Sequence, residues 1–207
     1  AVVQRVSYPV LSSIQSEPVR LREAYRRVIK LTMIVTFACM LGLAAIAKPL
    51  IILLIGEKWL PAVPFLQIIC FSGMLYPLHA INLNILQVKG RSDLYLKLEI
   101  IKKIIAVITI FIGIFWGIEC MLWGGVFVSF ISFFLNSYYS ADLIDYSTKN
   151  QISDIFPFLI ISLIVSFCIW LISFTEWSYI IILIIQIIVG IGLYWFCLLY
   201  TSPSPRD

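Results

Sequence analysis

The sequence predicts an all-α protein, a polytopic integral membrane bundle of about six complete transmembrane helices with a partial one before them. Hydrophobic residues make up 61% of the 207 residues and charged residues only 13%, whereas soluble domains carry about 25% charged residues. The mean hydropathy is +1.02. A soluble fold of this length cannot bury so many apolar side chains. The apolar runs also lack the alternation that is typical of a membrane β-barrel.

Six stretches are long and apolar enough to cross a bilayer as helices, which takes about 20 residues each. They cover Leu31–Ile55, Pro61–Val88, Leu94–Ile118, Cys120–Ala141, Ile155–Phe174 and Trp177–Phe196. We therefore expect the end of a preceding transmembrane helix in residues 1–15, a basic amphipathic helix in 16–30 and a six-helix transmembrane lobe in 31–196.

The last residues, Cys197–Asp207, read "CLLYTSPSPRD", where an apolar helix gives way abruptly to Ser-Pro repeats. Along their whole length they match the translation of a common transposase-type sequencing adaptor. We therefore expect 197–207 to be an artefact rather than part of the fold, and the chain to be an internal fragment of a longer protein.

Basic residues predict the orientation of the bundle. If the spans alternate, nearly all Lys and Arg residues lie on one side and only Lys48 and Lys58 lie on the other, and such an excess is typical of cytoplasmic loops. The segment "SEPVRLREAYRRVIK" places its bases on one helical face: Arg20, Arg22, Arg26, Arg27 and Lys30. This face is either an anchor to anionic lipid, at about 1 kcal/mol per base, or a contact for an acidic substrate.

Polar residues recur in the second span, which Pro61, Pro64 and Pro77 are expected to kink. On a continuous helix four of them share one face: Ser72, His79, Asn82 and Gln87. Such a stripe faces other helices or a water-filled cavity, because exposure to lipid is costly. His79, the only histidine, either makes interhelical hydrogen bonds or belongs to a substrate cavity or a proton-coupling site.

The third span carries bases deep into an apolar run, at Lys97, Lys102 and Lys103. A charge at the bilayer centre costs about 2.5–3.5 kcal/mol on insertion scales, and Glu99 can pair with either of the later lysines. Lysines near the headgroups can extend to water, but adjacent side chains point about 100° apart. The candidate cavity residues are therefore Lys97, Lys102 and Lys103 with His79, Asn82 and Gln87, and extension to the headgroups remains the alternative for the lysines.

Motifs for enzyme chemistry are missing from the sequence, which has no CxxC, HExxH, GxSxG or P-loop pattern. We therefore predict no catalytic residue, no metal, no cofactor and no enzyme activity. The net charge of +4 is modest and does not indicate a nucleic-acid partner.

Three segments resemble the polysaccharide flippases of O-antigen, capsule and exopolysaccharide pathways, within the multidrug/oligosaccharidyl-lipid/polysaccharide exporter superfamily. They are "YPVLSSIQSEPVRLREAYRRV" (Tyr8–Val28), "PLIILLIGEKWLPAVPFLQII" (Pro49–Ile69) and "MLYPLHAINLNILQVKGRSDLYLKLEIIKK" (Met74–Lys103). The resemblance covers about half of the chain, and beyond Ile104 only the topology agrees.

This resemblance implies a transporter of twelve to fourteen spans in two lobes, of which the chain forms mostly the C-terminal lobe. It implies transfer of an undecaprenyl-pyrophosphate-linked oligosaccharide from the inner to the outer leaflet of the bacterial inner membrane. The implied partners are this substrate, membrane lipids, a coupling ion and the polysaccharide polymerase machinery. A small-molecule or drug exporter of the same superfamily and a membrane-embedded enzyme of envelope synthesis are the alternatives.

Overall fold

The structure is a computed structural model that describes residues 2–201, with side chains described for residues 8–199. All regular elements in residues 2–201 are helical, so the predicted all-α class is confirmed. In chain order they are α1 (Val2–Ser13), α2 (Pro18–Ala45), α3 (Ala47–Ile55), the 3-10 helix η1 (Glu57–Ala62), α4 (Val63–Gly73), α5 (Tyr76–Val88), α6 (Ser92–Trp116), α7 (Ile118–Ile144), α8 (Thr148–Leu171), the 3-10 helix η2 (Ile172–Phe174) and α9 (Tyr179–Thr201). The expected artefact, 197–207, lies partly outside the described residues, because α9 ends at Thr201 and 202–207 are not described.

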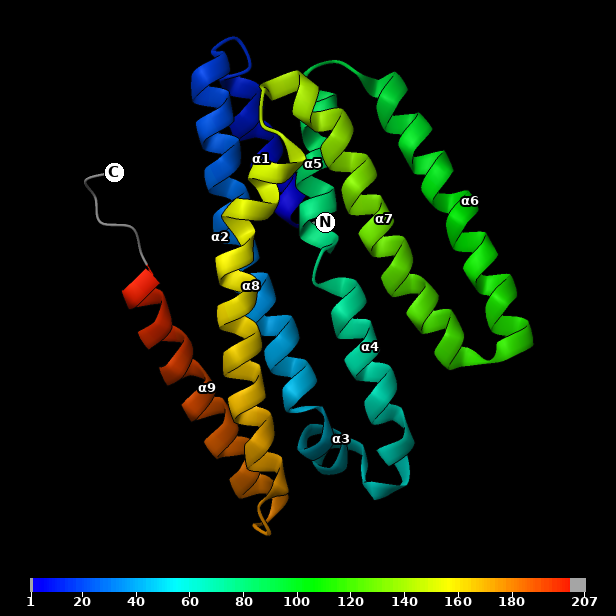
Figure 1. Cartoon of the computed structure of the whole chain (residues 1–207), viewed down its shortest axis with the longest axis vertical. Coiled ribbons are helices and arrows are strands. Elements are labelled where there is room, and N and C mark those ends of the chain that lie inside the picture. The colour runs from blue at the N-terminus through cyan, green and yellow to red at the C-terminus, as the bar shows by residue number, and fades with distance from the viewer. Residues whose placement is uncertain (1, 202–207) are drawn as a thin grey trace.

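The helices form an elongated bundle in which α7 packs against α4, α5 and α6, while α2 packs against α8 (Figure 1). Helices α6 and α9 lie at opposite edges. The connections α1–α2, α5–α6 and α7–α8 lie at one end of the bundle, and α6–α7 and α8–α9 lie at the other. We call the first of these the α7–α8 end, which is the end that the basic residues predict to be cytoplasmic.

Five helical segments are long and apolar enough to span a membrane, which confirms a polytopic membrane bundle. They are Pro18–Ala45, Glu57–Val88, Ile118–Ile144, Thr148–Phe174 and Tyr179–Leu199. The sequence predicted about six spans. Helix α6 covers the remaining one and is 25 residues long, but Glu99, Lys102 and Lys103 reach so far into it that only residues 104–116 form an uninterrupted uncharged run.

The basic amphipathic segment is not a separate helix, in contrast to the expected boundary at residues 30 and 31. Helix α2 continues from Pro18 to Ala45 without interruption. Pro18 starts the helix, and no other proline or glycine occurs before Gly42, so nothing in the backbone requires a break. The basic face is thus the terminal part of a membrane-spanning helix.

Two predicted spans are instead broken. The first divides at Ile46 into α2 and α3, and the second divides at Met74 and Leu75 into α4 and α5. Pro77 lies in the first turn of α5, where a proline costs no helical hydrogen bond. The predicted kink is therefore a change of helix, with Ser72 on α4 and the other three residues of the polar stripe on α5.

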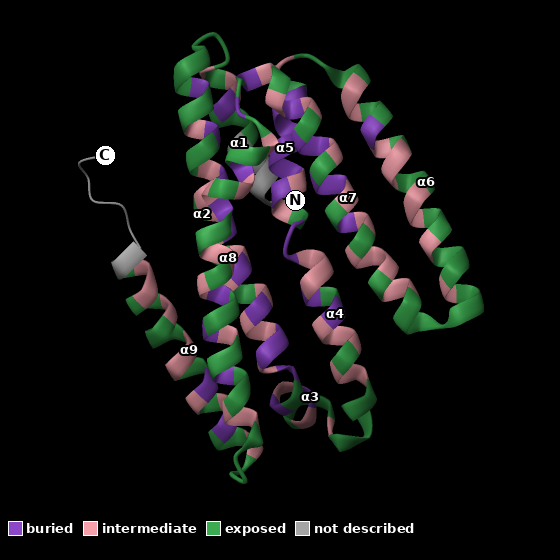
Figure 2. Cartoon of the chain, viewed as in Figure 1, coloured by how far each residue is buried: buried purple, intermediate pink, exposed green. Residues whose placement is uncertain are grey.

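The buried core lies towards the α7–α8 end and includes Tyr25, Phe37, Leu78 and Ile81, all at 0% exposure. Helix α6 beyond Leu98 and the C-terminal half of α9 carry little burial (Figure 2). Their exposed side chains are large and apolar, such as Phe115 and Trp195. Such surfaces suit hydrocarbon rather than water, in agreement with a membrane bundle.

Candidate functional site

A polar pocket lies between α4, α5, α6 and α7, and we call it the basic pocket. Its volume is about 510 Å³, within the usual range for small-molecule sites. The polar residues that line it are Ser72, Tyr76, His79, Tyr95, Glu99, Lys102, Lys103, Ser129 and Ser132. In a bundle with apolar outer surfaces, this gathering of polar side chains from four helices is the strongest candidate for a functional site.

His79 is fixed in the wall of the basic pocket by a short chain of hydrogen bonds. The Ser129 hydroxyl donates to the carbonyl oxygen of Ser72 at 2.9 Å, so its only proton is used there. His79 Nε2 lies 3.1 Å from Ser129 Oγ and must therefore be the donor. His79 Nδ1 is buried without a hydrogen-bond partner among the described residues, which leaves it free to bind a polar group.

Lys102 reaches the basic pocket as one half of an ion pair. Its ammonium group contacts the Glu99 carboxylate one turn earlier on α6, and the Lys102 side chain is only 13% exposed. With Lys103 the pocket holds two lysines against one glutamate. If His79 is neutral, these side chains leave one net positive charge, which favours an anionic ligand.

The neighbouring lysines differ in position. Lys103 is exposed and also borders a shallow apolar hollow on α6 beside Ile104 and Phe111. It lies at the edge of the pocket, where its ammonium group can either extend to water or contact a ligand. Lys97 is exposed and is not among the lining residues of the pocket.

The remaining predicted cavity residues lie elsewhere. Asn82 is fully buried and accepts hydrogen bonds from Tyr25 of α2 and, at 3.3 Å, from Ser140 of α7. Gln87 is exposed near the end of α5. The structure therefore brings His79, Lys102 and Lys103 together in the basic pocket. Lys97, Asn82 and Gln87 are not among the residues that line this pocket.

The basic face of α2 is partly neutralised by acidic residues of the α7–α8 end. Asp154 of α8 accepts hydrogen bonds from Arg26, whose Nη2 lies at 2.6 Å, and from the Tyr146 hydroxyl at 2.6 Å. Lys30 Nζ lies 3.0 Å from the same carboxylate. Burial, followed by the hydrogen bond to Asp154, raises the pKa of the Tyr146 hydroxyl. We call Asp154 and its three partners the Asp154 cluster.

The other bases of this face lie at the surface. Arg22 pairs with Asp145 at 3.1 Å, and Arg20 pairs with Glu17 at 3.4 Å. Arg20, Arg22 and Arg27 are exposed, so they remain accessible to lipid headgroups. Exposed pairs of this kind contribute at most about 1 kcal/mol each.

Sequence reasoning missed Asp154 and a polar stripe on α7. The stripe is buried and consists of Ser129, Ser132, Asn136, Ser137 and Ser140. The spacing of three, seven, eight and eleven residues from Ser129 places them on one helical face, and this period was the signal available in the sequence. Asp154 could have been found as an acid near the end of a predicted span, opposite a basic helix.

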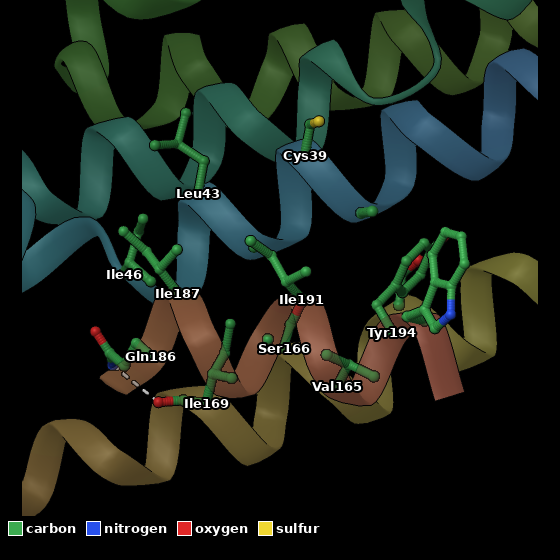
Figure 3. A pocket seen from close by; sticks show the side chains of 15 residues that line it. Cys39, Leu43, Ile46, Val165, Ser166, Ile169, Gln186, Ile187, Ile191 and Tyr194 are labelled. Atoms are coloured by element: carbon green, nitrogen blue, oxygen red, sulfur yellow. Dashed lines mark hydrogen bonds between the residues drawn. The ribbon is translucent and has the colours of Figure 1, made fainter. Parts of the chain in front are cut away.

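A second cavity lies between α2, α8 and α9, with a volume of about 500 Å³ (Figure 3). Its walls are mainly apolar and include Leu43, Val165 and Ile187. Gln186 donates hydrogen bonds from Nε2 to the Ile169 carbonyl and to Ser173 Oγ, both at 2.8 Å. Such walls suit hydrocarbon better than a sugar or a phosphate.

Among the described residues, no group of three or more His, Cys, Asp and Glu side chains could hold a metal ion. The fold and the basic pocket define a class of protein: a polytopic α-helical membrane protein with a polar, net positive site between its helices. This class includes transporters and channels as well as membrane enzymes.

Comparisons with known proteins narrow this class. Residues 1–64 match a family model described as "Polysaccharide biosynthesis protein". The chain is 31% identical over 116 residues to an "Uncharacterized membrane protein in cps region" of Klebsiella pneumoniae. The aligned residues are 56% of this chain and 24% of that protein. These findings confirm the resemblance that the three sequence segments indicate.

Two further relatives agree. The chain is 27% identical over 161 residues to "Teichuronic acid biosynthesis protein TuaB" of Bacillus subtilis (strain 168), covering 77% of this chain and 33% of that protein. It is 29% identical over 112 residues to "Lipopolysaccharide biosynthesis protein WzxC" of Escherichia coli (strain K12), covering 54% and 23%. The chain thus spans about a quarter to a third of these relatives. No solved structure matches it significantly.

Proposed function

We propose that the chain is part of a transporter that moves a lipid-linked oligosaccharide across the bacterial inner membrane for surface polysaccharide synthesis. The single observation that carries this proposal is the basic pocket, in which Lys102, Lys103 and His79 meet inside a membrane bundle. The similarity to polysaccharide biosynthesis proteins supports the same assignment.

The chemistry of such a substrate fits the pocket. A sugar cannot cross hydrocarbon unaided, because each hydroxyl group without a hydrogen-bond partner costs several kcal/mol. The serine and tyrosine hydroxyl groups of the pocket offer such partners. A pyrophosphate linked to undecaprenol would bind the lysines through charge-assisted hydrogen bonds, which are about twice as strong as neutral ones.

The position of the charges also bears on the alternative of a cation exporter. A cationic drug is best held by an uncompensated acid. Glu99 is an acid that lines the basic pocket, but Lys102 already neutralises it.

A membrane enzyme would require a nucleophile or an acid–base pair close to its substrate. The pocket also holds Ser129 beside His79, but the Ser129 proton is donated to the Ser72 carbonyl, so His79 is not placed to activate this hydroxyl as a nucleophile. Neither this pair nor the Glu99–Lys102 pair favours an enzyme, so we propose transport rather than catalysis.

The proposal is tested by complementation with the full-length gene in a strain that lacks its own flippase. Lys102→Ala together with Lys103→Ala should lower surface polysaccharide about tenfold or more, because two charged contacts with the pyrophosphate are lost. The matched control is Lys97→Ala with Lys149→Ala, which removes two exposed lysines outside the pocket.

Membrane protein levels are measured for every variant by immunoblotting, so that loss of transport is separated from loss of protein. Undiminished polysaccharide in the pocket variant would overturn the role of the two lysines. Equal losses in the pocket and control variants would show that total positive charge matters rather than this site.

A further inference from the structure

Five side-chain atoms on α5, α7 and α8 are buried without a hydrogen-bond partner among the described residues. They belong to Asn82 (Nδ2), Asn136 (Nδ2 and Oδ1) and Gln151 (Nε2 and Oε1). All three residues are at 0% exposure. Buried polar groups in native proteins are nearly always hydrogen-bonded to protein or to ordered water, so this concentration of unpaired amide atoms calls for a ligand.

The three amides come from different helices, and hydrogen bonds tie these helices together within about two helical turns. Ser140 of α7 donates to Asn82 of α5, and Ser137 of α7 donates to Thr148 of α8 at 3.0 Å. Helices α7 and α8 run antiparallel (Figure 1). The Ser137–Thr148 contact therefore places Asn136 and Gln151, each within one turn of it, at neighbouring heights.

This group of amides also adjoins the basic pocket. Ser132 lines the pocket, and Asn136 follows it by one turn on the buried face of α7, about 6 Å along the axis. At the other side, Tyr25 joins Asn82 by a hydrogen bond and contacts the ring of Tyr146, a member of the Asp154 cluster. Polar residues thus run from the pocket to the α7–α8 end.

We propose that ordered water molecules bind between Asn82, Asn136 and Gln151 and extend the basic pocket towards the α7–α8 end of the bundle. The chemistry of the unpaired atoms identifies the ligand. Three of the five are amide nitrogens, which donate hydrogen bonds and repel a cation, whereas the two oxygens accept them. Water both donates and accepts, and it is stable in buried sites that offer two to four polar partners.

The first test is the accessibility of cysteines introduced into the full-length protein, in membrane vesicles, after its native cysteines are replaced by alanine. A methanethiosulfonate reagent attacks the thiolate, which forms where water is present and is suppressed in apolar surroundings. Gln151→Cys should react at least about tenfold faster than Ile155→Cys, its control one turn later on α8, which is also buried but in the apolar core. Equal, slow rates at the two positions would overturn the proposal.

A second test uses stability and does not depend on cysteine chemistry. Asn136→Leu combined with Gln151→Met removes four of the unpaired atoms with little change in volume. If water satisfies these atoms, the Tm of the double variant should stay the same or fall. A higher Tm would show that the amides are unsatisfied and dry, and would contradict the proposal.

The third test separates water from a monovalent cation. The Tm of the unmodified protein should be the same in sodium chloride and in choline chloride at equal ionic strength. A higher Tm in sodium that is lost in the Asn136→Leu and Gln151→Met double variant would assign the site to a cation instead and would overturn the assignment to water.

Discussion

Tyr25 on α2 donates a hydrogen bond to Asn82 on α5 across 57 residues of sequence, and both side chains are completely buried. The Tyr25 ring also meets Tyr146 edge-on, with ring centroids 6.0 Å apart. One tyrosine therefore joins the basic end of α2, the helix that carries His79 and the loop before α8. The contact connects the α7–α8 end to a wall of the basic pocket.

Replacement of Tyr25 by Phe should lower the stability of the protein by about 1–3 kcal/mol, because Asn82 is left buried with one partner fewer. The apparent Tm in detergent measures this loss. Tyr138→Phe is the matched control on α7, since its side chain is exposed, and it should leave the Tm within experimental error. A similar Tm for both variants would contradict the role of the buried hydrogen bond.

Replacement of Asp154 by Asn should destabilise the protein by about 2–4 kcal/mol, because Arg26, Lys30 and Tyr146 all lose their anionic partner. The Asp154 side chain is 10% exposed. Asp145→Asn breaks an ion pair with Arg22 whose acid is 97% exposed, and it should change stability by less than about 0.5 kcal/mol. Chemical denaturation of the purified full-length protein gives both values, and equal losses would refute the ranking by burial.

The Glu99–Lys102 pair should show strong coupling in a double-mutant cycle. Lys102→Met alone leaves the Glu99 carboxylate without its basic partner. Glu99→Gln alone leaves the Lys102 ammonium group without its acidic partner. Each single variant should therefore lower the amount of folded protein in the membrane. The combined variant should recover stability by about 0.5–3 kcal/mol relative to the sum of the single effects. Strictly additive losses would mean that the two side chains do not interact.

Gly113 permits the close contact of α6 with α7, since a Cβ atom added there would lie 2.5 Å from Cβ of Met121. Gly113→Ala should therefore destabilise the protein by about 1–3 kcal/mol through overpacking. Gly192→Ala on α9 meets nothing within 4 Å and should be neutral or stabilising by up to about 1 kcal/mol, because alanine favours a helix. The apparent Tm should fall for Gly113→Ala, and it should stay the same or rise for Gly192→Ala.

The sequence predicts the helical membrane bundle well because continuous apolar runs of this length have few other solutions. It also predicts His79 and Lys102 as polar residues that avoid lipid. The spacing argument fails for Gln87, since it assumes that one face of the second span is covered along its whole length. Gln87 is exposed although Ile85, Leu86 and Val88 beside it are buried, so the end of α5 stays packed and only the side that carries Gln87 is uncovered.

Other features of the site depend on tertiary contacts that periodicity does not encode. Ser129 and Asp154 acquire their roles from partners 50 and 128 residues away. Ser72 and His79 line the basic pocket together, whereas Asn82, three residues after His79, is bound to Tyr25 and Ser140 instead. Pairing of this kind becomes visible only when the helices are assembled.

The turn at Gly117 gives the wall of the basic pocket a mechanical property. Gly117 has φ +94°, a conformation that favours glycine, and it joins α6 to α7. Helix α6 packs mainly on α7, and Lys102 lies fifteen residues before the turn, about 22 Å along the axis. At that radius a tilt of about 10° displaces the helix near Lys102 by about 4 Å. With Gly117 as the pivot, α6 has the geometry of a long lever arm, so a small rotation at this one glycine would change the width of the site by several ångströms.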